Sequence, residues 1–248
     1  MKSIFVYTNV AGVYEKRLYK PRRQSRDMRF ICFSDNPALA PHGWEVRDAI
    51  RLPPGINRPD LVNRYHKMFS HRILPEAEFS IYMDANLQVV GELLPLVEQL
   101  ERTGTVFGAA RHPERASYLE EIDACLSSRK FKMGDADRIA AQKSYYLQVG
   151  VPQDFLLAAG ILVRRHGSVE LDDAMNLWWE QVINFTARDQ ISLPYVLWKS
   201  GLPTTTYDFN ILRDNSFTSI HGHGQNPSVL QFVRRKLTRS LRALARVT

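Results

Sequence analysis

The chain has 248 residues, 44% of them hydrophobic and 10% aromatic, which supports a folded core and excludes a globally disordered protein. It contains no run of about 18 apolar residues, so we expect no transmembrane helix, and its short apolar start does not have the shape of a signal peptide. The net charge of +7 is concentrated in residues 15–29 and 229–248, so the chain between them is mildly acidic and no nucleic-acid partner is expected.

Short β-rich runs alternate along the chain with longer segments of helical spacing. The predicted strands are residues 3–8, 29–34, 44–47, 79–83, 106–110, 161–163 and 204–207. The predicted helices are residues 59–74, 91–100, 116–146, 168–185 and 192–199. This alternation predicts an α/β fold with a mainly parallel central sheet flanked by helices. No repeat or linker divides the chain, so we expect one domain over residues 1–228 and a separate helix over residues 229–248.

Polar residues stand where predicted strands end. Asn9, Asp35 and Asp84 each come at or directly after the end of an apolar run. In parallel sheets, ligands bind beyond the carboxyl ends of the strands. We therefore expect a binding site at this edge of the sheet.

Asp84-Ala85-Asn86 is the first candidate for chemistry. Two oxygen-bearing side chains two positions apart on an exposed turn suit Mg²⁺ or Mn²⁺ carrying a nucleotide diphosphate. The alternative is that Asp84 caps a following helix and Asn86 fills a turn. Spacing alone leaves both interpretations open.

Further along the chain, His221 and His223 lie in a glycine-flanked loop. Such a loop could supply a metal ligand, and the alternative is that both imidazoles are simply exposed to solvent. Arg64 and Lys67 are three residues apart on a predicted helix, which places them on one face that suits either a diphosphate or solvent. Asp189 either caps the helix that follows it or faces the reaction centre, where its carboxylate would stabilise an oxocarbenium-like carbon or orient an acceptor.

Several familiar enzyme motifs are missing from the sequence. There is no Gly-x-Gly-x-x-Gly fingerprint and no Walker-type Gly-Lys-Ser/Thr, which argues against dinucleotide oxidoreductases and P-loop ATPases. The Gly-x-Ser-x-Gly elbow of α/β hydrolases is also missing. Cys32 and Cys125 have no metal-ligand spacing, so we expect two buried thiols in a reducing cytosol.

Residues 229–248 carry apolar side chains every three or four positions, with six basic residues mostly between them and no acidic residue. This pattern predicts a basic amphipathic helix that binds an anionic membrane surface. The alternative is that its apolar stripe packs on the domain. With the cytosolic thiols, the pattern predicts a cytoplasmic protein bound peripherally to the inner face of the plasma membrane.

Taken in order, several segments resemble the TOD/MUCI-type glycosyltransferase-like domain family, from about Phe5 to about Leu202. The segments that carry the resemblance are Val6-Tyr7-Thr8-Asn9, Arg64-Tyr65-His66-Lys67, Ile81-Tyr82-Met83-Asp84, Arg111-His112-Pro113-Glu114-Arg115, Glu120-Glu121, Trp178-Trp179 and Arg188-Asp189-Gln190-Ile191-Ser192-Leu193-Pro194-Tyr195. The family looks like a GT-A (Rossmann-like) fold, distantly similar to retaining enzymes that use a nucleotide sugar and Mn²⁺.

The resemblance implies roles for individual residues. Asp84, Asn86 and His221 would bind the metal, with Asn86 in place of a carboxylate, so the metal would be held more weakly or not required. The Asp189-Gln190 pair would lie at the sugar and favours retention of the anomeric configuration. The remaining residues would contact the donor or the acceptor: Asn9 and Asp35 at the base and ribose, Arg64 and Lys67 at the diphosphate, and Arg111, His112 and Glu121 at the donor or acceptor side.

The leading hypothesis is therefore a hexosyltransferase-type glycosyltransferase that moves a sugar from a nucleotide diphosphate to a glycan or lipid-linked glycan. Two other functions stay open. One is a metal-dependent lipid amide hydrolase, since a plant member of the family has been described as a ceramidase. The other is a non-catalytic nucleotide-sugar-binding module, which Asn86 keeps possible.

Overall fold

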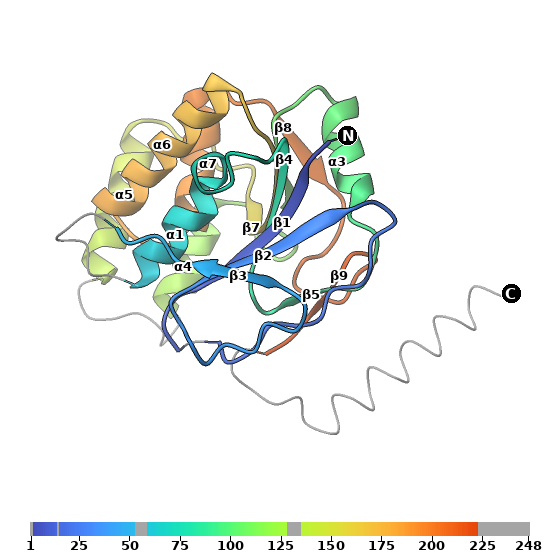
Figure 1. Cartoon of the computed structure of the whole chain (residues 1–248). Coiled ribbons are helices and arrows are strands. Elements are labelled where there is room, and N and C mark those ends of the chain that lie inside the picture. Colours follow the sequence, from blue (N-terminus) through green and yellow to red (C-terminus); the bar gives the residue numbers. More distant parts are fainter. Residues whose placement is uncertain (1, 14, 53–58, 128–134, 223–248) are drawn as a thin grey trace, which may run out of the picture.

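The computed structural model describes residues 2–13, 15–52, 59–127 and 135–222. Within them, a seven-stranded sheet has the order β3-β2-β1-β4-β7-β6-β8, and a second sheet pairs β5 with β9 (Figure 1). The strands of the large sheet are β1 (Ile4–Val10), β2 (Met28–Ser34), β3 (Glu45–Asp48), β4 (Phe79–Met83), β6 (Phe107–Arg111), β7 (Leu157–Arg165) and β8 (Thr204–Tyr207). The small sheet consists of β5 (Leu87–Val89) and β9 (Thr218–Ile220), which run antiparallel.

Strand direction brings the ends of several strands to one edge. The pairs β1–β2, β2–β3, β1–β4 and β6–β8 are parallel, whereas β7 is antiparallel to both β4 and β6. The predicted mainly parallel sheet is therefore confirmed, with β7 as the reversed strand. The carboxyl ends of β1, β2, β4 and β6 thus share an edge with the amino end of β7.

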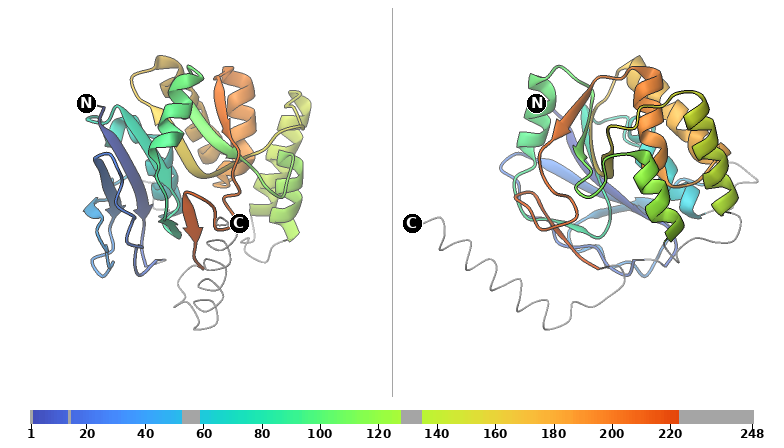
Figure 2. Two further views of the ribbon diagram at one scale, coloured as in Figure 1. Left: turned by 90° about the vertical axis from the view of Figure 1, so that its right-hand side faces the viewer. Right: turned by 180° about the vertical axis from the view of Figure 1, so that it is seen from behind.

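Helices cover both faces of this sheet, as predicted. They are α1 (Pro59–Met68), α2 (Ser70–Ile73), α3 (Leu94–Arg102), α4 (Tyr118–Ser127), α5 (Asp135–Gln148), α6 (Val169–Asn184) and α7 (Asp189–Ser200). Figures 1 and 2 show α1 and α4–α7 on one side of the sheet and α3 on the other. Because side chains alternate along a strand, Tyr7 packs into the core with α1, α6 and α7, whereas its neighbour Val6 packs into the core with α3.

Some predicted boundaries are wrong. The helix expected over residues 59–74 is divided at Phe69 into α1 and α2. The helix expected from Gly91 begins only at Leu94, because Gly91 touches the chain near β9: an added Cβ would lie 1.8 Å from the Ser216 carbonyl oxygen. Strands β5 and β9 were not predicted, since three residues are too short to show a periodic pattern.

The expectations for the cysteines, for membrane-spanning helices and for the C-terminal residues remain. Cys32 and Cys125 are buried thiols, as predicted, and burial raises the pKa of Cys32 to about 12. In the ranges that the structure covers, no helix is long and apolar enough to cross a membrane. His223 and the predicted basic helix over residues 229–248 lie outside the described residues.

Candidate active site

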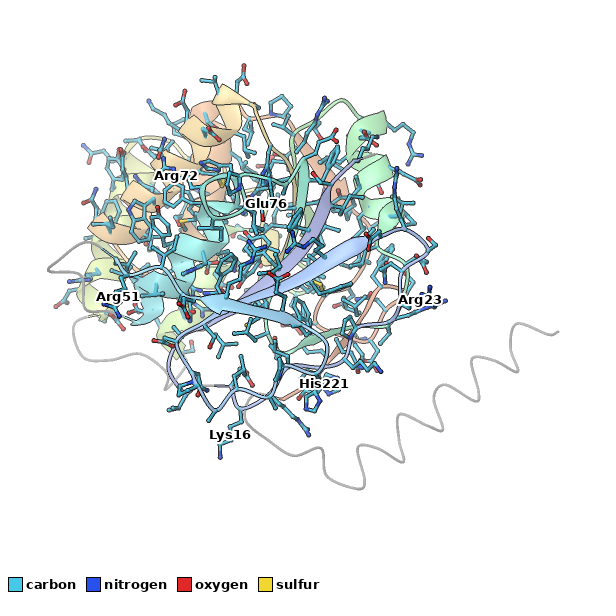
Figure 3. All side chains as sticks on the ribbon, in the orientation of Figure 1. Lys16, Arg23, Arg51, Arg72, Glu76 and His221 are labelled. Carbon is cyan, nitrogen blue, oxygen red and sulfur yellow. The ribbon has the colours of Figure 1, made fainter. Side chains whose placement is uncertain are left out.

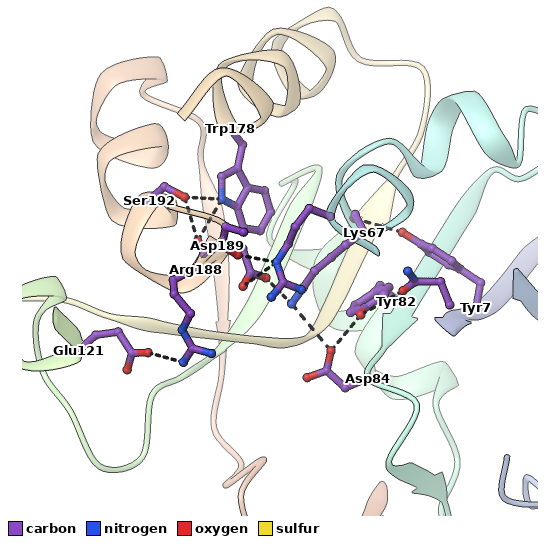
Figure 4. Close-up of polar contacts among 12 residues, drawn as sticks. Tyr7, Lys67, Tyr82, Asp84, Glu121, Trp178, Arg188, Asp189 and Ser192 are labelled. Carbon is purple, nitrogen blue, oxygen red and sulfur yellow. Dashed lines mark hydrogen bonds and ion pairs between the residues drawn. The ribbon is translucent and has the colours of Figure 1, made fainter. Parts of the chain in front are cut away.

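Asp84 occupies the sheet edge where a ligand is expected. It directly follows β4, and its backbone N–H donates to the Gly160 carbonyl oxygen of β7 at 2.9 Å. The Tyr82 hydroxyl donates to Asp84 Oδ1 at 2.9 Å (Figure 4). On the other side, a Cβ added to Gly160 would lie only 2.8 Å from Asp84 Oδ2. Two strands therefore fix the position of this carboxylate.

The next element after Asp84 is strand β5, so the alternative in which Asp84 caps a following helix is wrong. The Leu87 N–H donates to the Asp84 carbonyl oxygen at 2.9 Å, which closes the turn containing Ala85 and Asn86. The Asp84 side chain remains 43% exposed, enough for a ligand to reach it.

A second carboxylate, Asp189, lies beside the first. It is the first residue of α7, which starts three residues earlier than predicted, and its side chain contacts cations rather than capping the helix. Lys67 Nζ contacts Asp189 Oδ2 and lies 3.8 Å from Asp84 Oδ1. Arg64 Nε lies 3.4 Å from Asp189 Oδ1. Arg64 and Lys67 therefore share one face of α1, as predicted, and Lys67 links the two carboxylates.

The charge state of Asp189 follows from these neighbours. Burial by itself would raise the pKa of this carboxyl group, but the charges of Arg64 and Lys67 outweigh that effect, together with the Lys67 hydrogen bond and the Arg188 charge. The pKa is lowered to about 2. Asp189 is therefore an anion throughout the physiological pH range. Gln190 follows in the first turn of α7 and is half-buried.

The backbone that carries Lys67 is held by a buried network. Arg164 of β7 donates from Nη2 to the Lys67 carbonyl oxygen at 2.7 Å and from Nη1 to the Tyr7 hydroxyl at 3.1 Å. Sequence reasoning missed Arg164, Tyr7 and Tyr82 as parts of this site. The one available signal was an arginine directly after the apolar run Ile161-Leu162-Val163, because buried cations need partners.

Asn9 stands next to this cluster. Its Nδ2 donates to Asn63 Oδ1 at 2.5 Å, and its Oδ1 lies 3.5 Å from the Tyr82 hydroxyl. Asp35 is farther out: it is exposed, and its Oδ1 accepts a hydrogen bond from the Gly12 N–H at 2.7 Å. This contact ties the turn after β1 to the end of β2.

Asn86 and His221 are brought together by the small sheet. The His221 N–H donates to the Asn86 carbonyl oxygen at 2.9 Å, and Asn86 Nδ2 donates to the His221 carbonyl oxygen at 3.1 Å. The His221 ring stacks on Tyr19, with 3.6 Å between ring centroids, and its Nε2 lies 3.1 Å from Gln88 Oε1.

The donor set bears on whether a divalent ion fits here. In the described part of the chain, no group of three or more His, Cys, Asp and Glu side chains could hold a metal. Asp84 and Asn86 nevertheless offer oxygen atoms, and Mg²⁺ usually binds one or two carboxylates together with substrate phosphates, of which Asp84 supplies one. These two residues fit such an ion. His221 would join them only after its ring leaves Gln88.

The remaining predicted residues form a neighbouring group. Glu121 is 1% exposed and lies between two arginines, 2.7 Å from Arg115 Nε and 3.0 Å from Arg188 Nη2. His112 Nδ1 accepts a hydrogen bond from the Arg115 N–H at 3.0 Å. Through Arg188, this group adjoins Asp189 (Figure 4). Arg111 is separate from it, exposed at the end of β6.

The chain matches one family model and two curated plant proteins. A family model described as "TOD1/MUCI70, glycosyltransferase-like domain" matches residues 58–224, which include Asp84, Asp189 and His221 but not Asn9 or Asp35. The probable hexosyltransferase MUCI70 of Arabidopsis thaliana is 28% identical over 164 residues, which are 62% of this chain and 27% of that protein. The alkaline ceramidase TOD1 of the same plant is 27% identical over 141 residues, which are 52% of this chain and 30% of that protein. The chain thus spans less than a third of either relative.

Two solved structures also resemble this one. One is the apo form of mouse xyloside xylosyltransferase 1, with 12% identity and a TM-score of 0.47; the match covers 84% of this chain and 85% of that chain. The other is the apo form of the bifunctional glycosyltransferase WbbM, with 11% identity and a TM-score of 0.47; the match covers 83% of this chain and 39% of that chain. The matched family region covers more than half of the 248 residues and holds the carboxylates of the site. The chain belongs to the TOD1/MUCI70 glycosyltransferase-like domain family.

Proposed function

We propose that this domain has a GT-A fold and transfers a sugar from a nucleotide diphosphate to a glycan or glycolipid acceptor. The observation that carries the proposal is the pair of carboxylates Asp84 and Asp189, joined through Lys67 at the carboxyl edge of the sheet. One carboxylate is half-exposed and the other is a buried anion. The exposed carboxylate would hold a cation that faces the diphosphate, and the buried anion would stabilise the positive charge that develops on the anomeric carbon.

The transfer breaks the bond between the anomeric carbon and the diphosphate oxygen, and the electron pair leaves with the diphosphate. The acceptor hydroxyl oxygen bonds to the same carbon, and its proton passes to the leaving diphosphate. Asp189, held ionised, stabilises the positive charge that develops on the sugar, and Gln190 orients the sugar beside it. Arg64 and Lys67 offer cations to the diphosphate from the same side. An acceptor that attacks from the diphosphate face gives retention.

A divalent ion, Mn²⁺ or Mg²⁺, fits this scheme. Asp84 and Asn86 would hold it, with His221 as a third ligand, and the ion would neutralise charge on the diphosphate. Because Asn86 is neutral, we expect this chain to bind the ion weakly without a nucleotide and more tightly with one. Asn9 and Asp35 lie on the β1–β2 side of the edge, where we place the nucleoside, and Arg111, His112 and Glu121 lie toward the acceptor.

Lipid amide hydrolysis is the second candidate, because the name of one relative is alkaline ceramidase TOD1. Such a reaction needs a strongly held metal that activates water, and the described residues contain no three-ligand cluster of His, Cys, Asp and Glu. A screen of the purified chain against UDP- and GDP-sugars with Mn²⁺, and in parallel against ceramide, separates the two functions. Release of nucleoside diphosphate supports transfer, whereas release of fatty acid supports hydrolysis.

The basic residues of the C-terminal segment suggest where the protein acts. We propose that residues 229–248 bind the inner face of the plasma membrane, where lipid-linked acceptors are found. A second basic segment supports this: Lys16, Lys20, Arg23 and Arg26 form no ion pair within the described residues. Tyr19 of this segment stacks on His221, just before the chain continues to the tail. Lys16 and His221 lie at the same lower rim of the molecule in Figure 3.

A further inference from the structure

An apolar pocket lies beside the edge strand β8, apart from the two carboxylates. Its volume is about 380 Å³, within the range of small-molecule sites. The lining residues come from α7, the link from α7 to β8, β8 itself, the end of β6 and the start of β7 with the segment before it: Arg111, Pro152, Phe155, Leu156, Leu157, Leu197, Trp198, Leu202, Thr204 and Thr206. Seven of these ten side chains are apolar, and Arg111 is the one that carries a charge.

Arg111 lies at one end of this pocket. Thr204 pairs with Phe107 in the sheet, four residues before Arg111 on β6, so Thr204 and Arg111 lie roughly 13 Å apart along the sheet. Arg111 is exposed, and within the part of the chain that the structure covers no carboxylate pairs with it. A mostly apolar pocket with one uncompensated cation at its end complements a hydrocarbon chain that ends in an anion.

The charged end of the pocket points to the edge that carries Asp84. Arg111 pairs with Leu157 of β7, and Leu157 precedes Gly160 by three residues, or about 10 Å of extended strand. Gly160 accepts the backbone hydrogen bond of Asp84. Leu157 also faces the same core as Tyr82, on the side of the sheet that carries α1 and α7. A ligand in the pocket thus presents its anionic end toward the carboxylates.

We infer that this pocket holds the hydrocarbon chain of an acceptor whose glycan is joined to the lipid through a phosphate, with the phosphate at Arg111 and the reacting hydroxyl on the glycan. The inference rests on the proposed transferase function and narrows its acceptor from glycans in general to a glycan on an anionic lipid. Trp198 is 38% exposed in the free protein, and the hydrocarbon chain of the lipid would cover it. Burying apolar surface in a preformed pocket supplies the affinity, and Arg111 sets the direction in which the lipid enters.

Titration calorimetry with decyl phosphate, below its micelle concentration and without any donor, tests this pocket directly. We expect wild-type protein to bind decyl phosphate at least about tenfold more tightly than decyl maltoside, and not to bind inorganic phosphate measurably. Arg111→Gln removes the charge, and Thr206→Trp fills the pocket. Each change should weaken decyl phosphate binding about tenfold or more.

Two matched controls accompany these variants. Arg165→Gln removes an exposed arginine at the opposite end of β7, and Val169→Trp adds a large side chain at an exposed position of α6. Both should bind decyl phosphate as the wild type does. Equal binding of decyl phosphate and decyl maltoside, or unchanged binding by Arg111→Gln and Thr206→Trp, would overturn the inference. So would an oligosaccharide that binds wild-type protein and is lost in Thr206→Trp, because it would make the pocket a glycan subsite.

The titration involves no turnover, so its outcome is independent of whether the chain transfers sugar. Asp84→Asn should bind decyl phosphate like the wild type, whatever its effect on donor hydrolysis. If decyl phosphate fails to bind to a chain that still hydrolyses a nucleotide sugar, the lipid inference fails and the transferase proposal stands.

Discussion

Lys67 forms a buried ion pair with Asp189, although 122 positions separate them along the chain: Nζ contacts Oδ2, and the two side chains are 4% and 8% exposed. The same ammonium lies 3.8 Å from Asp84 Oδ1. The cation therefore belongs to both carboxylates of the candidate site. A change at Lys67 should therefore affect both the stability of the fold and the charges of the candidate site.

Replacing Lys67 by methionine should destabilise the fold, because it leaves the buried Asp189 charge with Arg64 as its main partner. Removing one member of a buried pair costs about 3 kcal/mol. Urea unfolding measures the change. Lys143→Met is the matched control, since its ion pair with Asp123 is exposed and should contribute less than about 1 kcal/mol. Equal losses in the two variants would show that the Lys67 pair is not specially stabilising.

The lowered pKa of Asp189 predicts a pH dependence of stability. A carboxyl group whose folded-state pKa lies below its unfolded value stabilises the protein above the unfolded pKa and loses that contribution as pH falls. From the ordinary 3.8 to about 2, the ionised group contributes about 2 kcal/mol. The free energy of unfolding of the wild type should exceed that of Asp189→Asn by a constant amount above pH 5, and this difference should shrink between pH 4 and pH 2. Unfolding free energies measured across this range check it, and a difference independent of pH would contradict it.

Gly160 sets the position of Asp84, so Gly160→Ala should reduce donor hydrolysis. The new Cβ would lie 2.8 Å from Asp84 Oδ2 and 2.7 Å from Ile211 Cδ1. Gly108→Ala is a matched control on the neighbouring strand β6, where the Cβ would meet the Tyr207 ring at 2.7 Å. Both variants should lose stability through overpacking, about 1–3 kcal/mol each.

The two glycine variants should differ in catalysis. Initial rates with a nucleotide sugar should fall about tenfold or more in Gly160→Ala, whereas Gly108→Ala should stay near the wild-type rate. Comparable rates in the two variants, once the folded fraction is accounted for, would mean that Asp84 does not need this position.

Removing residues 229–248 should weaken binding to anionic liposomes. Each basic residue near an anionic surface contributes about 1 kcal/mol, and the tail carries six. Sedimentation with liposomes of anionic and of neutral lipids, at low and high salt, measures the effect. We expect the full chain to pellet with anionic liposomes in a salt-sensitive way and the shortened chain to remain largely in solution. If both chains pellet equally, the tail is not the membrane anchor.

The sequence predicts the elements of this fold better than the contacts between them. The run Phe79–Met83 identifies β4, and the polar residue after it marks the carboxyl edge of the sheet, where we place the site. Nothing local shows that β7 is reversed, since strand direction depends on how the chain returns to the sheet. The short strands β5 and β9, which join Asn86 to His221, also escape pattern analysis because they are paired through tertiary structure.

The same limit applies to the site. Arg64 and Lys67 could be assigned to one helix face from their spacing, but their partner Asp189 lies on another helix, and no pattern in the sequence joins the two. Arg164 directly follows the predicted strand over residues 161–163, yet it is fully buried and donates to the Lys67 carbonyl oxygen. Such pairs are fixed only when the helices pack on the sheet.

The measurement that tests the transferase proposal most directly is nucleoside diphosphate release from UDP- and GDP-sugars with Mn²⁺, by wild type and by Asp84→Asn. Asp173→Asn, which changes an exposed carboxylate on α6, is the control. We predict release by wild type and by the control, and a rate about 100-fold lower for Asp84→Asn. Absence of release from every donor by wild type, or an unchanged rate in Asp84→Asn, would contradict a sugar transfer centred on Asp84.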